Sequence, residues 1–283
     1  MKIVLDIRRF DPRSGQPPRV QRFETTGEPT DRLIDVLLRI KGEQDASLSF
    51  RYSCAHGVCG SDAMRINGRE RLACRTLVRD LAPPAPATPP APGGVAGAGG
   101  VEGEDGQAVT VSIEPLRHLP VLRDLMVDQS PFFQNSLKVT PFLLPAENVR
   151  AEGRETLQTQ QQQAQFEDAT KCINCAACFS ACPVLEKNPR FLGPAAIVQA
   201  ARFVEDSRDW GLAPRRDALD SPDGVWACEN HFECTRVCPR EIKVTKLINL
   251  MKRRVTAERE KRGETVHDGT DGSGASGAAR KEA

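Results

Sequence analysis

CINCAACFSACP, residues 172–183, and CENHFECTRVCP, residues 228–239, are the two stretches that decide the fold of this 283-residue chain. The first is a complete C-x2-C-x2-C-x3-C-P run, in which three thiolates surround one iron-sulfur cubane and the fourth reaches a neighbouring cluster. The second run has the same frame, but His231 stands where its middle cysteine is expected. The seven thiolates divide into four and three, which predicts a 4Fe-4S cluster beside a 3Fe-4S cluster.

Each cysteine can be assigned to a cluster, because the fourth cysteine of each run serves the other cluster. The predicted 4Fe-4S ligands are Cys172, Cys175, Cys178 and Cys238. The predicted 3Fe-4S ligands are Cys182, Cys228 and Cys234. This exchange ties both motifs into one folding unit, and two neighbouring clusters form a path for electrons.

Other interpretations of these residues are less favourable. C-x2-C pairs also form tetrahedral zinc sites. Three features argue against zinc: the threefold C-x2-C-x2-C run, the prolines Pro183 and Pro239 after the terminal cysteines, and the odd number of thiols. The odd number also argues against disulfides, because one thiol would be left unpaired. His231 could bind a fourth iron, lie as a polar neighbour beside a three-iron cluster, or be a partly exposed polar residue. We favour the polar neighbour.

A further metal site is predicted in CAHGVCGSDAMRINGRERLAC, residues 54–74. The spacing of Cys54, Cys59 and Cys74 fits the plant-type 2Fe-2S loop C-x4-C-x2-C...C except at its third position, which is Asp62. A carboxylate can bind ferric iron, although oxygen is a harder donor than sulfur. The alternative is that Asp62 faces solvent and that water or Ser61 completes the site. We favour Asp62 as the fourth ligand because it lies at the expected offset.

Composition and charge exclude several classes of protein. A formal net charge of +1 argues against nucleic acid as the main partner. Asp6, Arg8 and Arg9 would interrupt the apolar stretch of a signal peptide, and nowhere do about 18 apolar residues run together. We therefore expect a soluble, cytosolic chain, in which a reducing compartment favours metal-ligating cysteines over disulfides.

Residues 1–118 are predicted to form a mixed domain. Residues 3–7 and 19–26 alternate as strands, residues 109–114 form a further strand, and a helix begins near Thr30. Asn67-Gly68 predicts a hairpin turn. Within this domain, 13 of the 25 residues from 82 to 106 are Pro or Gly, which predicts a disordered insertion because such a composition buries too little apolar surface.

Residues 119–262 are predicted to form a helical domain that carries both cysteine runs. Pro194 opens one helix, and a second helix from about residue 243 has an apolar stripe and a basic face. We interpret this basic face as a solvated surface in preference to a membrane contact. The Gly- and Ser-rich residues 263–283 are predicted to be a disordered tail.

With these ligands placed, the chain resembles the iron-sulfur subunit of succinate dehydrogenase or fumarate reductase, respiratory complex II. The resemblance covers residues 1–81 and 107–256 and is carried by SCAHGVCGSDAMRINGRERLAC, IEPLRHLPVLRDLMVDQSPFF, CINCAACFSACPV, NPRFLGPAAI and EDSRDWG. It implies an α+β fold class, with an N-terminal β-grasp plant-type ferredoxin domain and a C-terminal all-helical bacterial-ferredoxin-like domain.

The resemblance also implies partners and a role. Members of this family relay electrons one at a time from a flavoprotein subunit with covalent FAD through 2Fe-2S, 4Fe-4S and 3Fe-4S clusters to quinone. A membrane anchor, often with haem b, holds them as peripheral subunits, here expected at the cytoplasmic face of the inner membrane. Because this chain has no G-x-G-x-x-G fingerprint or other substrate-activating motif, the dicarboxylate chemistry is expected on the partner subunit.

Two positions near the expected quinone site depart from the family pattern. Lys187 replaces a tryptophan typical of many ubiquinone-reducing members, and Glu229 replaces a histidine usual after the first cysteine of the second run. Lys187 and His231 are predicted to lie near the quinone, and menaquinone is one candidate. The direction of the reaction stays open between succinate oxidation and fumarate reduction, and a free-standing electron carrier is the alternative from another class.

Overall fold

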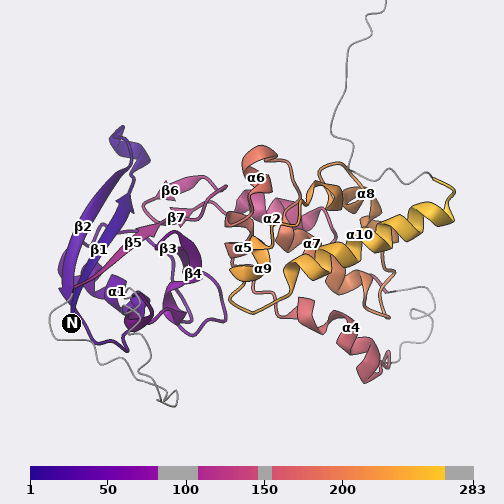
Figure 1. The fold of residues 1–283 in the computed structure, drawn as a ribbon, viewed down its shortest axis with the longest axis horizontal. Coiled ribbons are helices and arrows are strands. Elements are labelled where there is room, and N and C mark those ends of the chain that lie inside the picture. Colours follow the sequence, from indigo (N-terminus) through magenta and orange to yellow (C-terminus); the bar gives the residue numbers. More distant parts are fainter. Residues whose placement is uncertain (82–107, 146–154, 265–283) are drawn as a thin grey trace, which may run out of the picture.

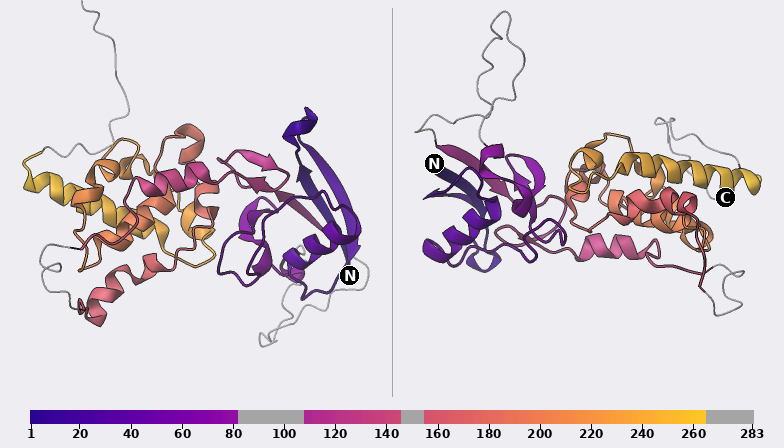
Figure 2. Two further views of the ribbon diagram at one scale, coloured as in Figure 1. Left: turned by 180° about the vertical axis from the view of Figure 1, so that it is seen from behind. Right: turned by 90° about the horizontal axis from the view of Figure 1, so that it is seen from below.

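The computed structural model describes residues 1–81, 108–145 and 155–264, which form a sheet-containing part followed by a helical part (Figure 1). Figure 2 shows from two further sides that the strands gather at one end of the molecule and the helices after α1 at the other. The predicted insertion at 82–106 and nearly all of the predicted tail lie outside the described residues.

A five-stranded mixed sheet forms the N-terminal part, in the order β2-β1-β5-β3-β4. Its strands are β1 (Lys2–Arg9), β2 (Arg19–Thr26), β3 (Ala63–Ile66), β4 (Arg69–Leu72) and β5 (Val109–Glu114). Only β1 and β5 pair in parallel, while the other neighbours are antiparallel. Helix α1 (Leu33–Glu43) buries its apolar stripe in the same core as Ile3, Leu5 and Ile7 of β1. The predicted strands and helix are confirmed.

Short elements complete this part of the chain. They are three 3-10 turns, η1 (Pro12–Ser14), η2 (Ala73–Arg75) and η3 (Val78–Leu81), and a hairpin of β6 (Val121–Arg123) and β7 (Met126–Val127). The expectation that helices begin near residue 119 is wrong, because this hairpin comes first and the first helix of the segment begins at Ser130.

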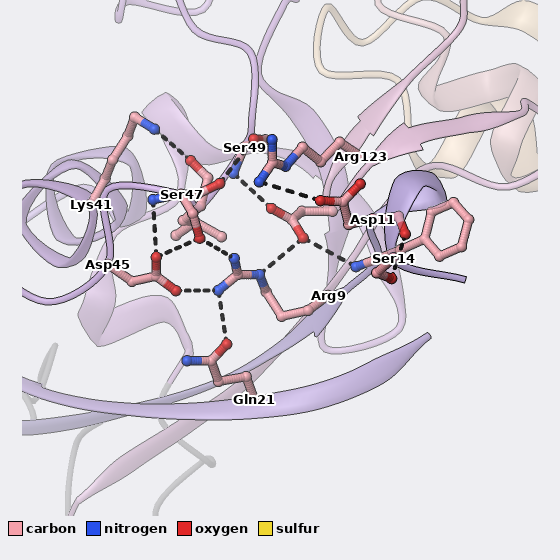
Figure 3. Close-up of polar contacts among 12 residues, drawn as sticks. Arg9, Asp11, Ser14, Gln21, Lys41, Asp45, Ser47, Ser49 and Arg123 are labelled. Carbon is pink, nitrogen blue, oxygen red and sulfur yellow. Dashed lines mark hydrogen bonds and ion pairs between the residues drawn. The ribbon is translucent and has the colours of Figure 1, made fainter. Parts of the chain in front are cut away.

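A buried ion network holds this hairpin against the sheet (Figure 3). Arg9 Nε donates to Asp124 Oδ1 at 2.9 Å, and Arg9 Nη1 donates to Asp45 Oδ2 at 2.6 Å. Asp124 also accepts the backbone N–H groups of Phe10 and Ser49. Hydrogen bonds from Arg9 and Ser47 lower the pKa of Asp45 to about 2. Ser49 lies just before the first cysteine loop, so the network connects that loop to the sheet.

The helical part is built around α7, whose residues are almost all buried. Its helices are α2 (Ser130–Leu137), α4 (Gln160–Thr170), α5 (Ala177–Ser180), α6 (Val184–Lys187), α7 (Pro194–Val204), α8 (Arg216–Leu219), α9 (Glu233–Arg236) and α10 (Val244–Lys261), with 3-10 turns η4 (Ala213–Arg215) and η5 (Val225–Ala227). Pro194 opens α7 as predicted, and the predicted apolar stripe of α10 is buried in its own domain. In the described part of the chain, no helix combines the length and apolarity needed to cross a bilayer.

Polar contacts join the two parts. Ser180 Oγ in α5 donates to the buried Glu70 Oε1 of β4 at 2.8 Å and accepts the backbone N–H of Arg117 at 2.9 Å. Arg69 Nη2 donates to the carbonyl oxygen of Arg236 at 2.9 Å. The bonds made by Glu70 and Arg69 connect the β3–β4 hairpin to the short helices α5 and α9, which carry or adjoin predicted cysteine ligands.

Candidate iron-sulfur sites

The β3–β4 hairpin brings together two predicted ligands of the N-terminal site. Ala63 pairs with Leu72, so Asp62 just before β3 and Cys74 two residues after Leu72 lie at the same end of the hairpin. The backbone N–H of Cys74 donates to Asp62 Oδ2 at 2.6 Å. Asn67 and Gly68 adopt φ +50° and +74° at the opposite end, as the predicted turn requires.

The two remaining thiols come from the preceding loop. Cys54 Sγ accepts the backbone N–H groups of His56 at 3.5 Å and Cys59 at 3.4 Å. These backbone hydrogen bonds lower the pKa of Cys54 to about 6, which favours the thiolate that binds iron. Burial and the neighbouring Asp62 carboxylate raise the pKa of Cys74 to about 12. A bound cation would relieve this mutual repulsion.

Asp62 fits a metal ligand. It is 3% exposed, so the alternative in which it faces solvent is wrong. Its Oδ1 is buried and has no hydrogen-bond partner among the described residues, while Oδ2 accepts from Cys74. A buried carboxylate oxygen without a partner is costly, and coordination to iron would compensate it. Ser61, the other residue considered as the fourth ligand, also lies near the site, because its Oγ is 3.1 Å from Cys59 Sγ. That Asp62 ligates iron stays a prediction.

The seven cysteines of the helical part line two neighbouring cavities. The first cavity is lined by Cys172, Cys175, Cys178 and Cys238 among largely apolar neighbours. The second is lined by Cys182, Cys228 and Cys234, and also by His231. This grouping matches the predicted exchange between the motifs, and α5 lies between Cys175 and Cys182. That each thiol binds iron stays a prediction.

Burial shapes the chemistry of these thiols. Desolvation raises the pKa of Cys175 to about 12 and that of Cys182 to about 11. Such thiols become thiolates when a metal cation compensates the buried charge. Across the described residues, no three His, Cys, Asp or Glu side chains converge on a point that would hold a single ion. In a 4Fe-4S or 3Fe-4S cluster each thiolate binds a different iron, so ligands that line a cavity suit such a cluster.

The two cysteine runs share a backbone signature that the sequence reasoning did not use. Asn174 and Asn230 occupy the second position after the first cysteine of each run, with φ +52° and +57°. Ala176 and Phe232, two residues later, have φ +61° and +64°. The thiols of the first cysteines lie 3.6 and 3.8 Å from the two asparagine Oδ1 atoms. Because asparagine tolerates the left-handed region, its repetition at one offset was a readable signal.

The predicted quinone-site residues lie together on the surface. Glu229 Oε2 bonds Lys187 Nζ at 3.1 Å and His231 Nε2 at 2.8 Å. Hydrogen bonds from His231 and then Lys187 hold the pKa of Glu229 below its ordinary value. Glu229 and His231 also line the second cavity, together with the half-exposed Phe232. The second cavity, lined by three cysteines, thus has exposed polar side chains at its edge.

Comparisons with known proteins agree with this geometry. Residues 4–134 match a 2Fe-2S iron-sulfur cluster binding domain, and residues 168–242 match a 4Fe-4S dicluster domain. These matches confirm the predicted 2Fe-2S and 4Fe-4S cofactors, and the cavity with three cysteines fits a 3Fe-4S cluster.

Relatives of known name cover most of the chain. A fumarate reductase iron-sulfur subunit from Mycobacterium tuberculosis is 38% identical over 85% of this chain and 87% of its own length. A succinate dehydrogenase iron-sulfur subunit from Coxiella burnetii is 33% identical over 91% and 99%. A chain of the Mycobacterium smegmatis Sdh1 complex in the apo form superposes with a TM-score of 0.75 at 25% identity and covers 92% of this chain and 97% of that chain. The expected α+β fold class is confirmed.

Proposed function

The chain belongs to the family of iron-sulfur subunits of succinate dehydrogenase and fumarate reductase, and from this membership we propose that it serves a complex that oxidises succinate. Electron transfer is the family role of the chain. The observation that carries electron transfer is the pair of cavities lined by four and three cysteines next to a third, carboxylate-containing site. The proposed direction is supported by a relative named succinate dehydrogenase iron-sulfur subunit.

The residues of the chain hold and tune three clusters. When bound, iron-sulfur clusters accept and release one electron at a time. We propose that Cys54, Cys59, Asp62 and Cys74 hold the 2Fe-2S cluster. Apolar side chains around the first cavity limit contact with water. Backbone N–H groups such as those bonded to Cys54 Sγ influence the reduction potential by stabilising negative charge on sulfur.

The arrangement of the sites supports a direction along the molecule. The N-terminal loop lies against the part of the fold that carries Cys175, and the second cavity lies beside Lys187, Glu229 and His231. We therefore place the FAD-containing flavoprotein near the 2Fe-2S site and the membrane anchor over the second cavity. Lys187 and His231 would then contact the quinone headgroup, and the chain would be peripheral at the cytoplasmic face of the inner membrane.

Fumarate reduction is the second candidate. Relatives from Mycobacterium tuberculosis and Haemophilus influenzae are named fumarate reductase iron-sulfur subunits, and the same clusters conduct electrons in either direction. A free-standing carrier is the third possibility and predicts a chain that purifies without a flavoprotein or an anchor.

Purification of the native complex tests these proposals. We expect a flavoprotein and an anchor to copurify, and succinate:quinone activity to exceed fumarate reduction with ubiquinone and menaquinone analogues. A Lys187→Ala variant should raise the KM for quinone several-fold while succinate oxidation with an artificial electron acceptor stays normal. Lys138→Ala, at an exposed lysine whose hydrogen bond within the described part of the chain is to nearby Asn135, is the matched control. Faster fumarate reduction would reverse the proposed direction, and an unchanged quinone KM would remove Lys187 from the quinone site.

A further inference from the structure

Gly60 is the point where the N-terminal cysteine loop touches the first cavity. It follows Cys59 directly and has φ +70°. A Cβ atom built at Gly60 would lie 2.6 Å from Cys175 Cβ and 3.0 Å from Cys175 Cα. These neighbours belong to backbone or lie next to it and cannot swing aside. The two cysteine loops therefore approach each other to a distance that leaves no room for a side chain.

Other glycines of this domain show that the close approach is particular to Gly60. A Cβ at Gly57 would meet the Cδ and Cγ atoms of Arg75, a flexible side chain of the same domain. A Cβ at Gly68 would meet Arg65 Nη2 at 4.0 Å, an ordinary contact. Gly68 has φ +74°, so Gly60 and Gly68 share their backbone conformation and differ in what surrounds them.

The rest of the interface supports the same approach. Arg69 Nη2 donates to the carbonyl oxygen of Arg236, which lies two residues before Cys238. Arg75 Nη1 lies 3.5 Å from the carbonyl oxygen of Pro239, directly after Cys238. Cys175 and Cys238 both line the first cavity. Hydrogen bonds to residues before and after Cys238 therefore hold the N-terminal domain against the segment that carries this predicted 4Fe-4S ligand.

We propose that Gly60 is a positioning residue that sets the distance between the 2Fe-2S and 4Fe-4S sites, and that its contact with Cys175 is the crossing point for electrons between the domains. This inference rests on the proposed function. The step transfers one electron: the 2Fe-2S site is oxidised by one electron, the 4Fe-4S site is reduced by one, and no bond forms or breaks. The flavoprotein partner supplies the electron. The rate of electron tunnelling falls exponentially with distance. Glycine at position 60 lets the two cysteine loops lie closer together, so it favours rapid transfer.

The test is Gly60→Ala in the full chain with its clusters. The new Cβ requires the two backbones to separate by about 1 Å to restore ordinary carbon–carbon contact. We expect a full complement of iron, weaker relaxation enhancement of the reduced 2Fe-2S paramagnetic resonance signal by the reduced 4Fe-4S cluster, and several-fold slower electron transfer between the two sites after rapid photochemical reduction. Gly68→Ala is the control: it introduces the same left-handed strain and should leave both readouts unchanged.

A second variant covers the case in which Gly60→Ala does not assemble. Ile173 Cδ1 lies 3.3 Å from the same Cβ position, and Ile173→Phe enlarges this neighbour without backbone strain at Gly60. It should also slow the transfer. Normal relaxation enhancement and normal transfer rates in a fully loaded Gly60→Ala protein, or in Ile173→Phe if only that variant loads, overturn the inference. Failure of the unaltered chain to bind iron-sulfur clusters would instead overturn the proposed function, so the two failures are distinguishable.

Discussion

Asp62 combines two roles that no other described residue of the N-terminal site combines. One carboxylate oxygen accepts the backbone N–H of Cys74, and the other is buried without a hydrogen-bond partner among the described residues. The first oxygen shapes the end of the hairpin, and the second is available to iron. Replacement of Asp62 therefore affects both the loop and the cluster.

Asp62→Ala should lose the iron of the 2Fe-2S site, because it removes one ligand and leaves the Cys74 N–H without its acceptor. Asp62→Cys should retain the cluster and change its reduction potential, since the ligand charge and donor atom change. Iron analysis and the resonance signal of the reduced cluster measure both effects. Asp80→Ala, at an exposed residue of the same domain, is the control. Stable full 2Fe-2S occupancy in Asp62→Ala would exclude Asp62 as a ligand.

His231 lies at the position of the missing cysteine and lines the cavity of three thiols. His231→Cys restores the complete C-x2-C-x2-C-x3-C-P run, so we expect the third site to bind a fourth iron. Paramagnetic resonance of the oxidised protein should then lose its 3Fe-4S signal. His231→Ala removes the imidazole without adding a thiol and should keep that signal. A persistent 3Fe-4S signal in a folded His231→Cys protein would argue against the assigned position.

Among the elements, the β6–β7 hairpin depends on contacts with distant strands. Its strands comprise three and two residues, too few to show a clear alternation in the sequence. Asp124 in its turn bonds Arg9, Phe10 and Ser49, which lie far away along the chain. For this reason hydrophobic periodicity could predict the long strands and α1 but not this hairpin.

The Arg9 network should contribute strongly to the stability of the N-terminal domain. Asp124→Ala leaves the 7%-exposed Arg9 without its buried partner, so the free energy of unfolding should fall by about 3 kcal/mol or more. Asp6→Ala removes the exposed Asp6–Arg22 pair of the same sheet and should cost at most about 1 kcal/mol. Urea unfolding followed by circular dichroism compares the two variants. Equal losses would show that burial does not control the strength of these pairs.

For the whole molecule, we expect iron to stabilise the two parts of the chain unequally. Helices α5, α6 and α9 contain four residues each, far below the roughly 12 residues that an isolated helix needs for marginal stability. The cysteines around them line the two cavities, where a bound cluster would link these short segments covalently. The apolar core runs through both parts and includes Ile3, Leu5 and Leu37 in the sheet-containing part. That part has one predicted cluster site, whereas the helical part has two.

Removal of iron by chelation under reducing conditions should therefore unfold much of the helical part and spare the sheet. Structural metals supply folding free energy, and their loss leaves buried thiols without compensation. Far-ultraviolet circular dichroism should lose helical signal, and limited proteolysis should gain new cleavage sites after residue 155. Restoration of iron and sulfide should reverse both changes. An unchanged helical signal in iron-free protein would show that the helices fold without clusters.

Residues close together in the sequence determined the types of site and the family of this protein. A predicted ligand set such as Cys172, Cys175 and Cys178 lies in one short backbone segment, so its spacing alone indicates the type of cluster. The exchange of Cys182 and Cys238 between cavities was predictable for the same reason, because it belongs to the motif.

Tertiary structure alone decided how these sites meet. The contact of Gly60 with Cys175, the burial of Asp62 and the pairing of Arg9 with Asp124 join residues from separate elements or separate domains. No local pattern of charge or hydrophobicity encodes such contacts, because they depend on how completed elements pack. The sequence therefore determined what the chain binds, and the packing of its two domains decided how closely the first two sites lie.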